Sequence, residues 1–497
     1  MSAIGYGAIT TGAGATGLWL PATHAAYTTP TDKDIAWALG AFAARRAEYQ
    51  LYADYLAGAH RRFWRLRDDG AEFTDFLRRV AVNFCPRIVA AFTDRLRIIG
   101  FEPHAEAAGD EQLAEAAWAL WQDRRLERHF NQLFSTAFGL GDAYLIVWPD
   151  ATGRAQFYPE SPLHVAVKYD GETRAIALGA KLWADGRHHR LNLYYADRIE
   201  RFITRADNAT LPNTPSGFRP YGDAPNGGDT VINPYGRVPI FHFGAEAGVG
   251  QLGTSVLRPV LSIQDDYNVA SATLAVVREY QAWPLRWAIG IDPEAQIEVG
   301  PDRLIKVASS MGMDGGDKPA FGQFAAADLT AYFNNKESSL MELAAVTGVP
   351  PHLLHRGLGT PPSGEALKTA EAPLASRVEK AQTNFGDEAE NAIAFGLVIE
   401  RRAASADDGA GLTALWQSAY TRSDRDEAET VAIKVERVGL SVRRGLVELG
   451  YSETEIDEIL ADKEIEREAA SVALDRSMNV GGVPGTVVDI TEEASSA

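Results

Sequence analysis

The longest regular pattern of apolar positions in the chain lies at residues 255–281. Apolar side chains recur there at alternating steps of four and three residues, at Val256, Val260, Ile263, Tyr267, Ala270, Leu274 and Val277. A heptad seam of this kind predicts a helix that packs lengthwise along a partner, and at about 1.5 Å per residue it would be roughly 40 Å long. Taken alone, the pattern also fits a long core helix in any large domain.

Two more long helices are predicted after this one, at about residues 326–347 and 363–399. Ser363 is a plausible N-cap for the last of them. Pro373 lies inside it, where proline removes a backbone hydrogen bond and clashes with the preceding turn, so we expect a kink there.

A β insertion of about forty residues separates the first two of these helices. It contains two strand-like pieces, at residues 285–291 and 303–308, and a glycine-rich turn at residues 311–316. Two long helices joined through such an insertion form an unusual arrangement.

The part of the chain before residue 255 is predicted to be helical first and β-rich afterwards. Helical patterns cover residues 32–58, 73–96, with Pro86 at a break or a new first turn, and 111–138. Strand-like runs follow at residues 143–148, 157–158, 163–169, 175–183 and 191–203, and the Pro-, Gly- and Asn-rich stretch 207–234 is predicted to be a loop.

The C-terminal part is predicted to be acidic and helical. Residues 424–468 hold fourteen acidic and seven basic side chains at helical spacing, and Ser452 with Glu455 forms a capping box. The Gly-, Ala- and Thr-rich residues 1–30 are predicted to be a flexible arm, and the tail beyond Met478 to be disordered.

Composition places the chain among soluble globular proteins, and the order of predicted elements, helical first and β-rich afterwards, indicates the α+β class, mainly helical. With 497 residues it is too long for one core, and we expect two to four regions. No apolar stretch reaches the ~18 residues of a membrane helix, and the start lacks the pattern of a signal peptide. The single cysteine, Cys85, excludes an intrachain disulfide, fits a reducing cytoplasm and is predicted to be a buried thiol.

The net charge of −19 argues against a protein that grips duplex DNA, because such proteins carry a basic footprint toward the phosphates. The charge fits a carbohydrate enzyme, an assembly protein, or a channel wall along which DNA slides. Charge alone does not choose among these three.

No pattern in the sequence assembles a catalytic, cofactor or metal site. Gly12 to Gly17 matches the dinucleotide fingerprint by letter, but no strand precedes it and Pro21 would break the helix that must follow. A phosphate-binding Gly-x-x-x-x-Gly-Lys-Ser/Thr loop and a Gly-x-Ser-x-Gly nucleophile elbow are both absent from the sequence. We therefore expect no enzyme activity and no ATP-driven motor in this chain.

Three polar pairs remain as candidates for chemistry. His352 with His355 and the adjacent His188 and His189 lack acidic or Cys partners at metal-ligand spacing, so surface histidines are expected. The neighbours Asp265 and Asp266 point about 100° apart on a helix and cannot share one proton. They are predicted to form a polar face opposite the seam, or to line a channel.

Short blocks in a fixed order carry a resemblance to a known family. They are Tyr52-Ala-Asp-Tyr-Leu-Ala-Gly-Ala-His60, the stretch Asn83 to Phe101 with Asp94-Arg-Leu96, Gly139-Leu-Gly-Asp-Ala-Tyr-Leu-Ile-Val-Trp148, Gly236-Arg-Val-Pro-Ile240, Gly253-Thr-Ser255, Gln264-Asp-Asp-Tyr-Asn268, Gly348-Val-Pro350 and Ser363-Gly-Glu-Ala-Leu-Lys368. On these blocks residues 49–397 resemble the portal proteins of tailed bacteriophages, in the branch with long non-contractile tails.

The resemblance implies a portal fold with wing, stem, clip and crown regions and small β-rich parts in the wing and clip. It places an arm at 1–30, the wing at 31–253, stem helices at 254–282 and 326–350, and the clip at 283–325. A tunnel loop follows at 351–362, then the kinked helix and wing return at 363–423, the crown at 424–478 and the tail at 479–497.

The resemblance also implies a role and partners. The chain would form a homo-oligomeric ring of about twelve subunits at one capsid vertex, a passive conduit for packaging and ejecting double-stranded DNA. It would dock the terminase large subunit and a head-to-tail adaptor, contact the major capsid protein and scaffold, and not enter a membrane. Its place would be the virion, and the host cytoplasm during assembly.

Specific residues follow from these implied roles. The tunnel loop would present His355, Arg356, Gly357, Thr360, Ser363 and Lys368 to DNA. The clip docking surface would use Arg286, Trp287, Asp302, Arg303 and Lys306. Packing between stem subunits would use Val256, Val260, Ile263, Tyr267, Leu274 and Val277, and Pro373 would bend the following helix.

Two departures and two rival interpretations accompany the resemblance. The arm before Thr31 is outside the family pattern, and Gly386-Asp-Glu-Ala-Glu390 follows Phe385 where a bulky aromatic is expected. Another head-completion or tail ring protein is the first rival. A carbohydrate hydrolase is the second, although the sequence supplies no pair of carboxylates in a recognisable motif.

Overall fold

The computed structural model describes residues 32–60, 79–103, 111–207, 210–222, 230–248, 250–282, 286–289, 320–323, 329–355, 364–402, 411–420, 424–449, 451 and 455–467. Several predictions lie outside these residues: the arm, the tail, the strand at 303–308, the glycine-rich turn, and the capping roles of Ser363 and Ser452. The same holds for the site residues Arg356, Gly357, Thr360, Ser363, Asp302, Arg303 and Lys306. The chain divides into two compact units, Met1–Tyr420 and Thr421–Ala497.

The first unit opens with helices that share a common core, except that the first half of α1 packs in a second core with the six-stranded sheet. They are α1 (Asp32–Leu56), α3 (Cys85–Thr93), α4 (Glu111–Asp123) and α5 (Leu126–Leu140). Pro86 occupies the first turn of α3, as predicted, and Cys85 is fully buried. The prediction of one helix over 111–138 is wrong, because Arg125 adopts the left-handed conformation (φ 51°) and separates α4 from α5.

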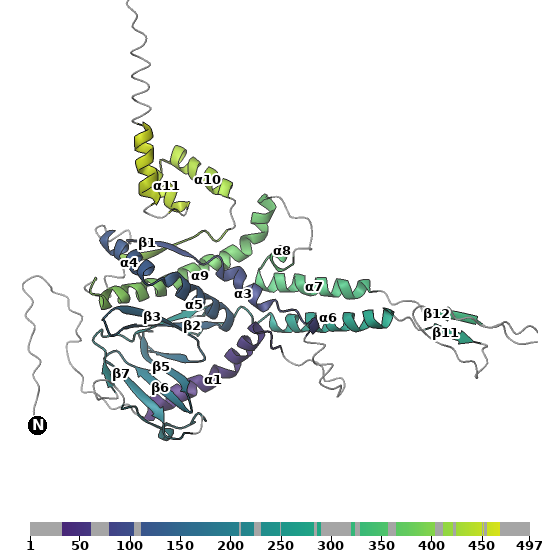
Figure 1. The fold of residues 1–497 in the computed structure, drawn as a ribbon, viewed down its shortest axis with the longest axis horizontal. Coiled ribbons are helices and arrows are strands. Elements are labelled where there is room, and N and C mark those ends of the chain that lie inside the picture. The colour runs from purple at the N-terminus through teal and green to yellow at the C-terminus, as the bar shows by residue number, and fades with distance from the viewer. Residues whose placement is uncertain are drawn as a thin grey trace, which may run out of the picture. The chain divides into compact units, whose positions relative to one another are not determined.

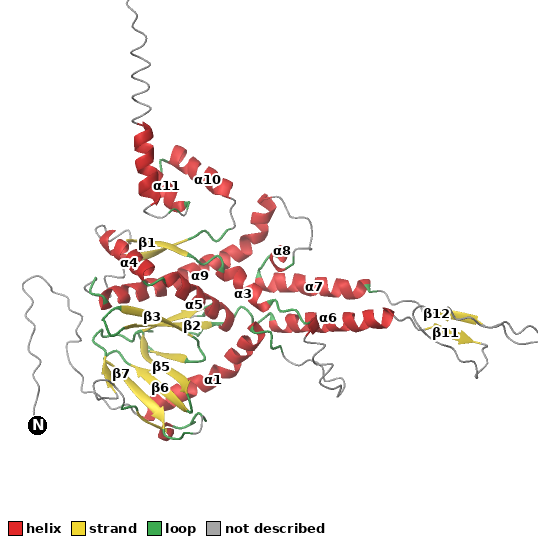
Figure 2. Cartoon of the chain, in the orientation of Figure 1, coloured by secondary structure: helices red, strands yellow, loops and turns green. Residues whose placement is uncertain are grey.

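Antiparallel sheets follow the helices (Figure 2). A three-stranded sheet has the order β10-β2-β3, and a six-stranded sheet runs β4-β5-β6-β7-β8 with β9 also paired to β7. Their bounds are β2 (Asp142–Pro149), β3 (Ala155–Glu160), β4 (Val165–Tyr169), β5 (Ile176–Asp185), β6 (His188–Tyr194), β7 (Arg198–Thr204), β8 (Phe218–Pro220), β9 (Thr230–Ile232) and β10 (Ile240–Gly244).

Two strand predictions in this region are wrong. The run 191–203 is two strands, β6 and β7, because the chain turns at Tyr195 and its amide bonds back to the carbonyl of Arg198 at 2.8 Å. The stretch 207–234, predicted as loop, contributes β8 and β9 along opposite halves of β7. His188 and His189 are the first two residues of β6.

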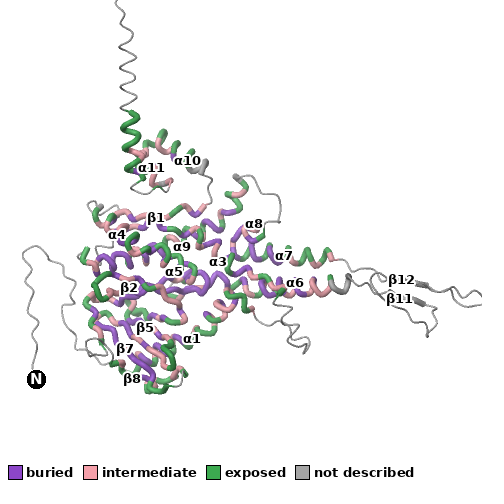
Figure 3. The backbone as a smooth tube through the Cα atoms, viewed as in Figure 1, coloured by how far each residue is buried: buried purple, intermediate pink, exposed green. Residues whose placement is uncertain are grey.

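The largest core is centred on α5, β2, β10 and the long helix α9 (Gly364–Ile399). Figure 3 shows buried stretches along α5, α9 and β2, where these elements contribute to this core. Phe134 of α5 stacks on Phe385 of α9 at 5.3 Å between ring centroids, and Phe243 of β10 meets both rings edge-on. Three buried aromatic rings of this size contribute roughly 1.5–3 kcal/mol each by burial.

The strand β13 (Leu412–Trp416) pairs with β1 (Ile98–Pro103) and lies against α9. Its Trp416 ring contacts Phe134, and a Cβ added at Gly386 of α9 would lie 3.4 Å from the Trp416 Nε1 atom. The aromatic expected just after Phe385 on α9 is therefore supplied by β13.

The helix pair predicted by the heptad pattern is present as α6 (Leu261–Ala282) and α7 (Thr330–Thr347), which lie side by side (Figure 1). Helix α6 begins at Leu261 rather than at residue 255, and residues 256–260 form turns. Pro259 explains the later start, because the residue before a proline disfavours helical backbone. The short helix α8 (Pro351–Leu354) follows α7 and was not predicted.

Two short strands in the connection between α6 and α7 pair with each other. Strand β11 (Arg286–Ile289) pairs antiparallel with β12 (Ala320–Gln323), so Arg286 faces Gln323 and Ile289 faces Ala320. The predicted strand at 285–291 is confirmed by β11. Strand β12 was missed, because a four-residue segment containing glycine carries no alternating pattern.

The second unit is helical, as the sequence predicts. It contains α10 (Asp424–Ile433), a π-helical turn (Lys434–Val438), α11 (Val442–Glu448) and a helix over 455–467. Ser441 caps α11 by accepting a hydrogen bond from the Arg444 amide at 3.3 Å. Among the described helices of both units, none is long and apolar enough to cross a membrane.

Among the glycines that the structure describes in the first unit, Gly253 should be the least replaceable. A Cβ there would lie 1.9 Å from the Gly141 carbonyl oxygen and 2.8 Å from the Ala245 amide nitrogen. We expect Gly253→Ala to lower the free energy of unfolding by about 3 kcal/mol or more. Gly40 lies in an exposed turn of α1, where an added Cβ would meet no neighbouring side chain within 4 Å. Gly40→Ala should therefore raise the free energy of unfolding by roughly 0.5–1 kcal/mol. Thermal melting of both variants tests this, and unchanged melting of Gly253→Ala would contradict it.

Candidate functional site at the base of the helix pair

A buried carboxylate joins the segments that lead into the helix pair. Asp142, at the start of β2, is fully buried, and each of its oxygens accepts two hydrogen bonds. Oδ1 accepts from His242 Nε2 at 2.6 Å and from the Gly253 amide at 2.7 Å. Oδ2 accepts from the Tyr49 hydroxyl and from Arg45 Nη1, both at 2.7 Å. Donors from α1, β10 and the segment before α6 thus converge on one group.

The surroundings of Asp142 keep it ionised. Burial by itself raises the pKa of this carboxyl, but the hydrogen bond and charge of His242, the Tyr49 hydroxyl and the Gly253 amide outweigh burial, so the pKa is lowered from 3.8. Because His242 Nε2 faces a carboxylate, that nitrogen carries the proton. Its Nδ1 lies 2.5 Å from the Tyr169 hydroxyl, which can donate to it. This fixes the ring between β2 and β4.

A second set of polar contacts anchors α6 itself. Asp265 is buried and accepts hydrogen bonds from the Tyr55 hydroxyl at 2.6 and 2.8 Å. The Gln264 amide spans residues 82–84, donating to the Val82 carbonyl at 2.7 Å and accepting from the Phe84 amide at 2.8 Å. Asn268 accepts from the Val82 amide at 3.0 Å. One turn of α6 therefore holds both α1 and the segment before α3.

These contacts correct the interpretation of Asp265 and Asp266. Asp265 does not lie on an outward polar face or in a channel, because it is buried against Tyr55. Asp266 is exposed and keeps its predicted outward position.

The heptad positions pack within the chain rather than outside it. Val256, Val260, Tyr267 and Leu274 are at most 6% exposed in a single chain. These side chains are therefore already covered within the single chain. Their role in packing between subunits stays a prediction, as it does for the half-buried Ile263 and Val277.

Ion pairs and a hydrogen bond connect α9 with α8 and α7 on both sides of Pro373. Glu371 lies 3.4 Å from both Arg95 and His352. Arg377 bonds to the carbonyl of Thr347 at the end of α7 and to Glu246, where the Nε–Oε1 distance is 2.9 Å. Pro373 is inside α9, as predicted, and the bend expected there stays a prediction.

The structure places the predicted site residues in separate segments. His355 follows α8 and Lys368 lies near the start of α9, both exposed. Arg286 and Trp287 lie in β11. The described residues contain no cluster of His, Cys, Asp or Glu side chains that could hold a metal ion. Sequence reasoning missed Arg45, Tyr49, Asp142 and His242, although an aspartate at the start of an otherwise apolar strand signals buried partners.

The sequence compares with known proteins over most of its length. A sequence model described as phage portal protein, SPP1 Gp6-like, matches residues 36–469. The chain belongs to this portal family. The match extends from α1 through the helix pair to the last helix of the second unit, so it covers all of the contacts described above. It decides against the rival interpretation as another head-completion or tail ring protein.

Individual relatives agree with the family. The portal protein of Mycobacterium phage D29 is 25% identical over 423 residues, and that of Mycobacterium phage L5 is 24% identical over 432 residues. Each alignment covers 81% of this chain and 81% of the relative. Portal proteins are structural proteins, which fits the expectation that the chain is not an enzyme.

Among solved structures, similar chains come from gene transfer agent (GTA) particles. A chain in the neck of a native GTA particle computed with C12 symmetry is 15% identical, with a TM-score of 0.42 over 77% of this chain and 94% of that chain. A chain in the virion of a native GTA particle is 16% identical, with a TM-score of 0.42 over 81% and 99%.

Asp142→Asn should lower the free energy of unfolding and also make that free energy less sensitive to acid. Losing one partner of a buried ionic network is expected to cost about 3 kcal/mol or more near neutral pH. Because the folded-state pKa lies below 3.8, the carboxylate's contribution is fully present above that pH and is lost as the pH falls through the folded-state value. The wild type should therefore lose more stability than the variant as the pH falls from about 5 towards 2.

Thermal melting across that pH range measures the effect. Asp266→Asn, at an exposed carboxylate of α6, is the matched control and should keep the acid dependence of the wild type. An Asp142→Asn protein with the same acid slope as the wild type would show that the carboxylate is not a stabilising group.

Proposed function

We propose that the chain assembles into a closed ring of about twelve subunits at one capsid vertex and acts there as a passive conduit for double-stranded DNA. The observation that carries the proposal is the portal family match over residues 36–469, which spans the whole helix pair and its hairpin. Helices α6 and α7 would be the stem and the β11–β12 hairpin part of the clip.

Exposed apolar side chains on α7 support contacts between stems. Phe333 is 53% exposed and Met341 43% exposed in the single chain. Eight residues apart, they lie about 80° apart around the helix and so share one flank of α7. Large apolar side chains together on one surface are typical of an interface between proteins. In the ring, this flank would meet the stem of the neighbouring subunit, while the heptad seam closes the pair internally.

In the proposed ring, different segments of the chain would contact different partners. The hairpin, with Arg286 and Trp287, would dock the terminase large subunit and later the head-to-tail adaptor. The loop from His355 to Pro362 would approach DNA, and the sheets and helices before residue 253 would contact the major capsid protein and scaffold. The ring would belong to the virion and form in the host cytoplasm. With a net charge of −19, it would let DNA slide rather than hold it.

Ring formation is testable by imaging and native mass spectrometry of the purified chain. We expect rings of about twelve subunits with a central hole. Phe333→Glu should shift the population to monomers by placing a charge in the α7 contact. Tyr158→Glu, at an exposed side chain of β3, should leave rings intact. Purely monomeric wild-type protein under assembly conditions would refute the proposed ring.

The loop from His355 to Pro362 should be needed for DNA handling and not for assembly. It joins α8, which ends at Leu354, to α9, which begins at Gly364. We expect replacement of these residues by a glycine-serine linker of equal length to preserve rings and to reduce the packaged DNA recovered from particles. Packaged DNA is measured by nuclease protection, and a wild-type yield would contradict the assigned role.

A further inference from the structure

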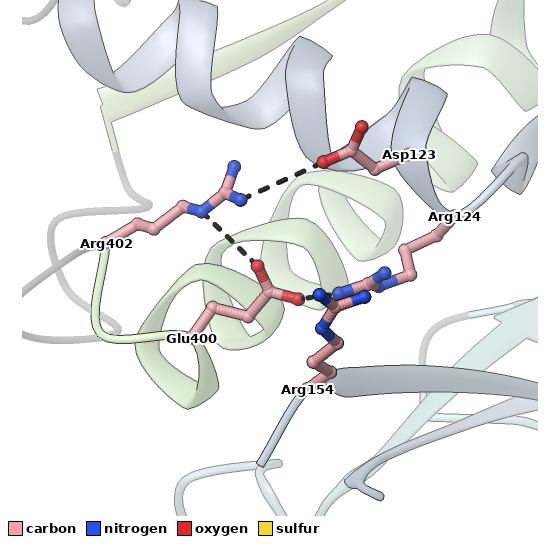
Figure 4. Close-up of a pocket in the computed structure, with 5 residues that line it drawn as sticks. All are labelled: Asp123, Arg124, Arg154, Glu400 and Arg402. Carbon is pink, nitrogen blue, oxygen red and sulfur yellow. Dashed lines mark hydrogen bonds and ion pairs between the residues drawn. The ribbon is translucent and has the colours of Figure 1, made fainter. Parts of the chain in front are cut away.

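We propose that a cavity at the meeting point of α4, β3 and α9 is a binding site for a phosphate-class oxyanion. The cavity measures about 340 Å³ and is lined by Asp123, Arg124, Arg154, Glu400 and Arg402 (Figure 4). Nothing in the conduit role calls for such a site, which lies at the opposite end of α9 from the tunnel loop.

One wall of the cavity is fixed by buried interactions. The side chain of Glu400 is 8% exposed, and its two carboxylate oxygens pair with Arg124 and, at 3.3 Å, with Arg402. Arg124 is itself held in place, because its Nε donates to the Ala155 carbonyl at 3.1 Å. Arg402 also reaches Asp123 at 3.8 Å. The guanidinium group of Arg124 is therefore held in place, whereas Arg402 reaches the same carboxylate from a more exposed position.

The wall carries one more positive charge than negative. Three arginines face two carboxylates, and Glu400 already uses both oxygens. The arginines at the ends of α4 and α9 have an ordinary explanation, because cations stabilise helix C-termini. This explanation does not apply to Arg154, because it lies directly before strand β3 and not at the end of a helix.

Arg154 is the observation that points to a ligand. Its side chain makes no hydrogen bond or ion pair with any described residue. Figure 4 shows it pointing toward the Arg124–Glu400 pair, and both arginines line the same cavity. An anion bound there could accept charge-assisted hydrogen bonds from both guanidinium groups.

The chemistry of the wall favours a tetrahedral, multiply charged anion. Guanidinium groups bind phosphate oxygens in a bidentate fork, and three of them approach from three different elements. A planar, singly charged carboxylate matches one such fork, whereas a tetrahedral phosphate presents oxygens to Arg154 and to a second guanidinium at once. The chain is strongly acidic as a whole, so a local excess of positive charge here is a specific feature and not part of a basic surface.

The test is thermal melting and isothermal titration of the full chain with inorganic phosphate. Phosphate should raise the melting temperature saturably, whereas sodium chloride at matched ionic strength should not. Arg154→Ala should weaken phosphate binding by roughly tenfold or more, and Arg154→Glu should abolish it. Because Arg154 is exposed, neither change should prevent folding. Arg219→Ala, at an exposed arginine of β8, is the matched control and should bind like the wild type.

Two results would overturn the assignment. The first is phosphate binding that is absent, or equal in the wild type and Arg154→Glu. The second is an acetate effect at equal concentration that matches or exceeds the phosphate effect, which would make the site a carboxylate receptor.

Discussion

The buried carboxylate of Asp142 is the constraint on which the first unit depends. An isolated charge in a protein interior is so unfavourable that the surrounding chain must supply donors in fixed positions. Arg45, Tyr49, His242 and the Gly253 amide meet this need from parts of the sequence as far as 111 residues away. Satisfying one group therefore sets the relative positions of α1, β2, β10 and the segment that enters α6.

The base of α6 extends the same principle one step along the chain. Gln264, Asp265 and Asn268 use side-chain atoms to bind backbone groups of residues 82–84 and the hydroxyl of Tyr55. Apolar packing along the seam holds α6 and α7 together, while these polar contacts fix the position of α6 relative to α1 and residues 82–84. Apolar packing tolerates sliding by a turn, whereas hydrogen bonds to specific backbone atoms do not.

The elements with strong periodicity could be predicted from the sequence, and the contacts between distant residues could not. Helices α1, α6, α7 and α9 follow from apolar spacing, because one buried face per helix leaves its period in the sequence. The break at Arg125 was missed because a single left-handed residue leaves the apolar period of both flanking helices intact.

The burial of the charged groups could not be predicted from the sequence either. Tyr55 and Asp265 are 210 residues apart, and nothing local distinguishes Asp265 from the exposed Asp266 beside it. The same limit applies to the seam. Its pattern shows that one face of α6 is covered, but an apolar face looks the same whether the cover is α7 of the same chain or a neighbouring subunit. Only the fold distinguishes these cases, and it assigns most of the seam to the chain's own interior.

The way in which α6 is anchored has a consequence for inheritance. The partners of its buried polar side chains are Tyr55 of α1 and the backbone of residues 82–84, which lie 180 to 210 residues earlier in the chain. A recombination event that replaced only the helix pair would separate these buried groups, Asp265 among them, from their partners. Crossovers that preserve folding should therefore fall outside the interval from α1 to α7, so that this part of the gene is exchanged as one block.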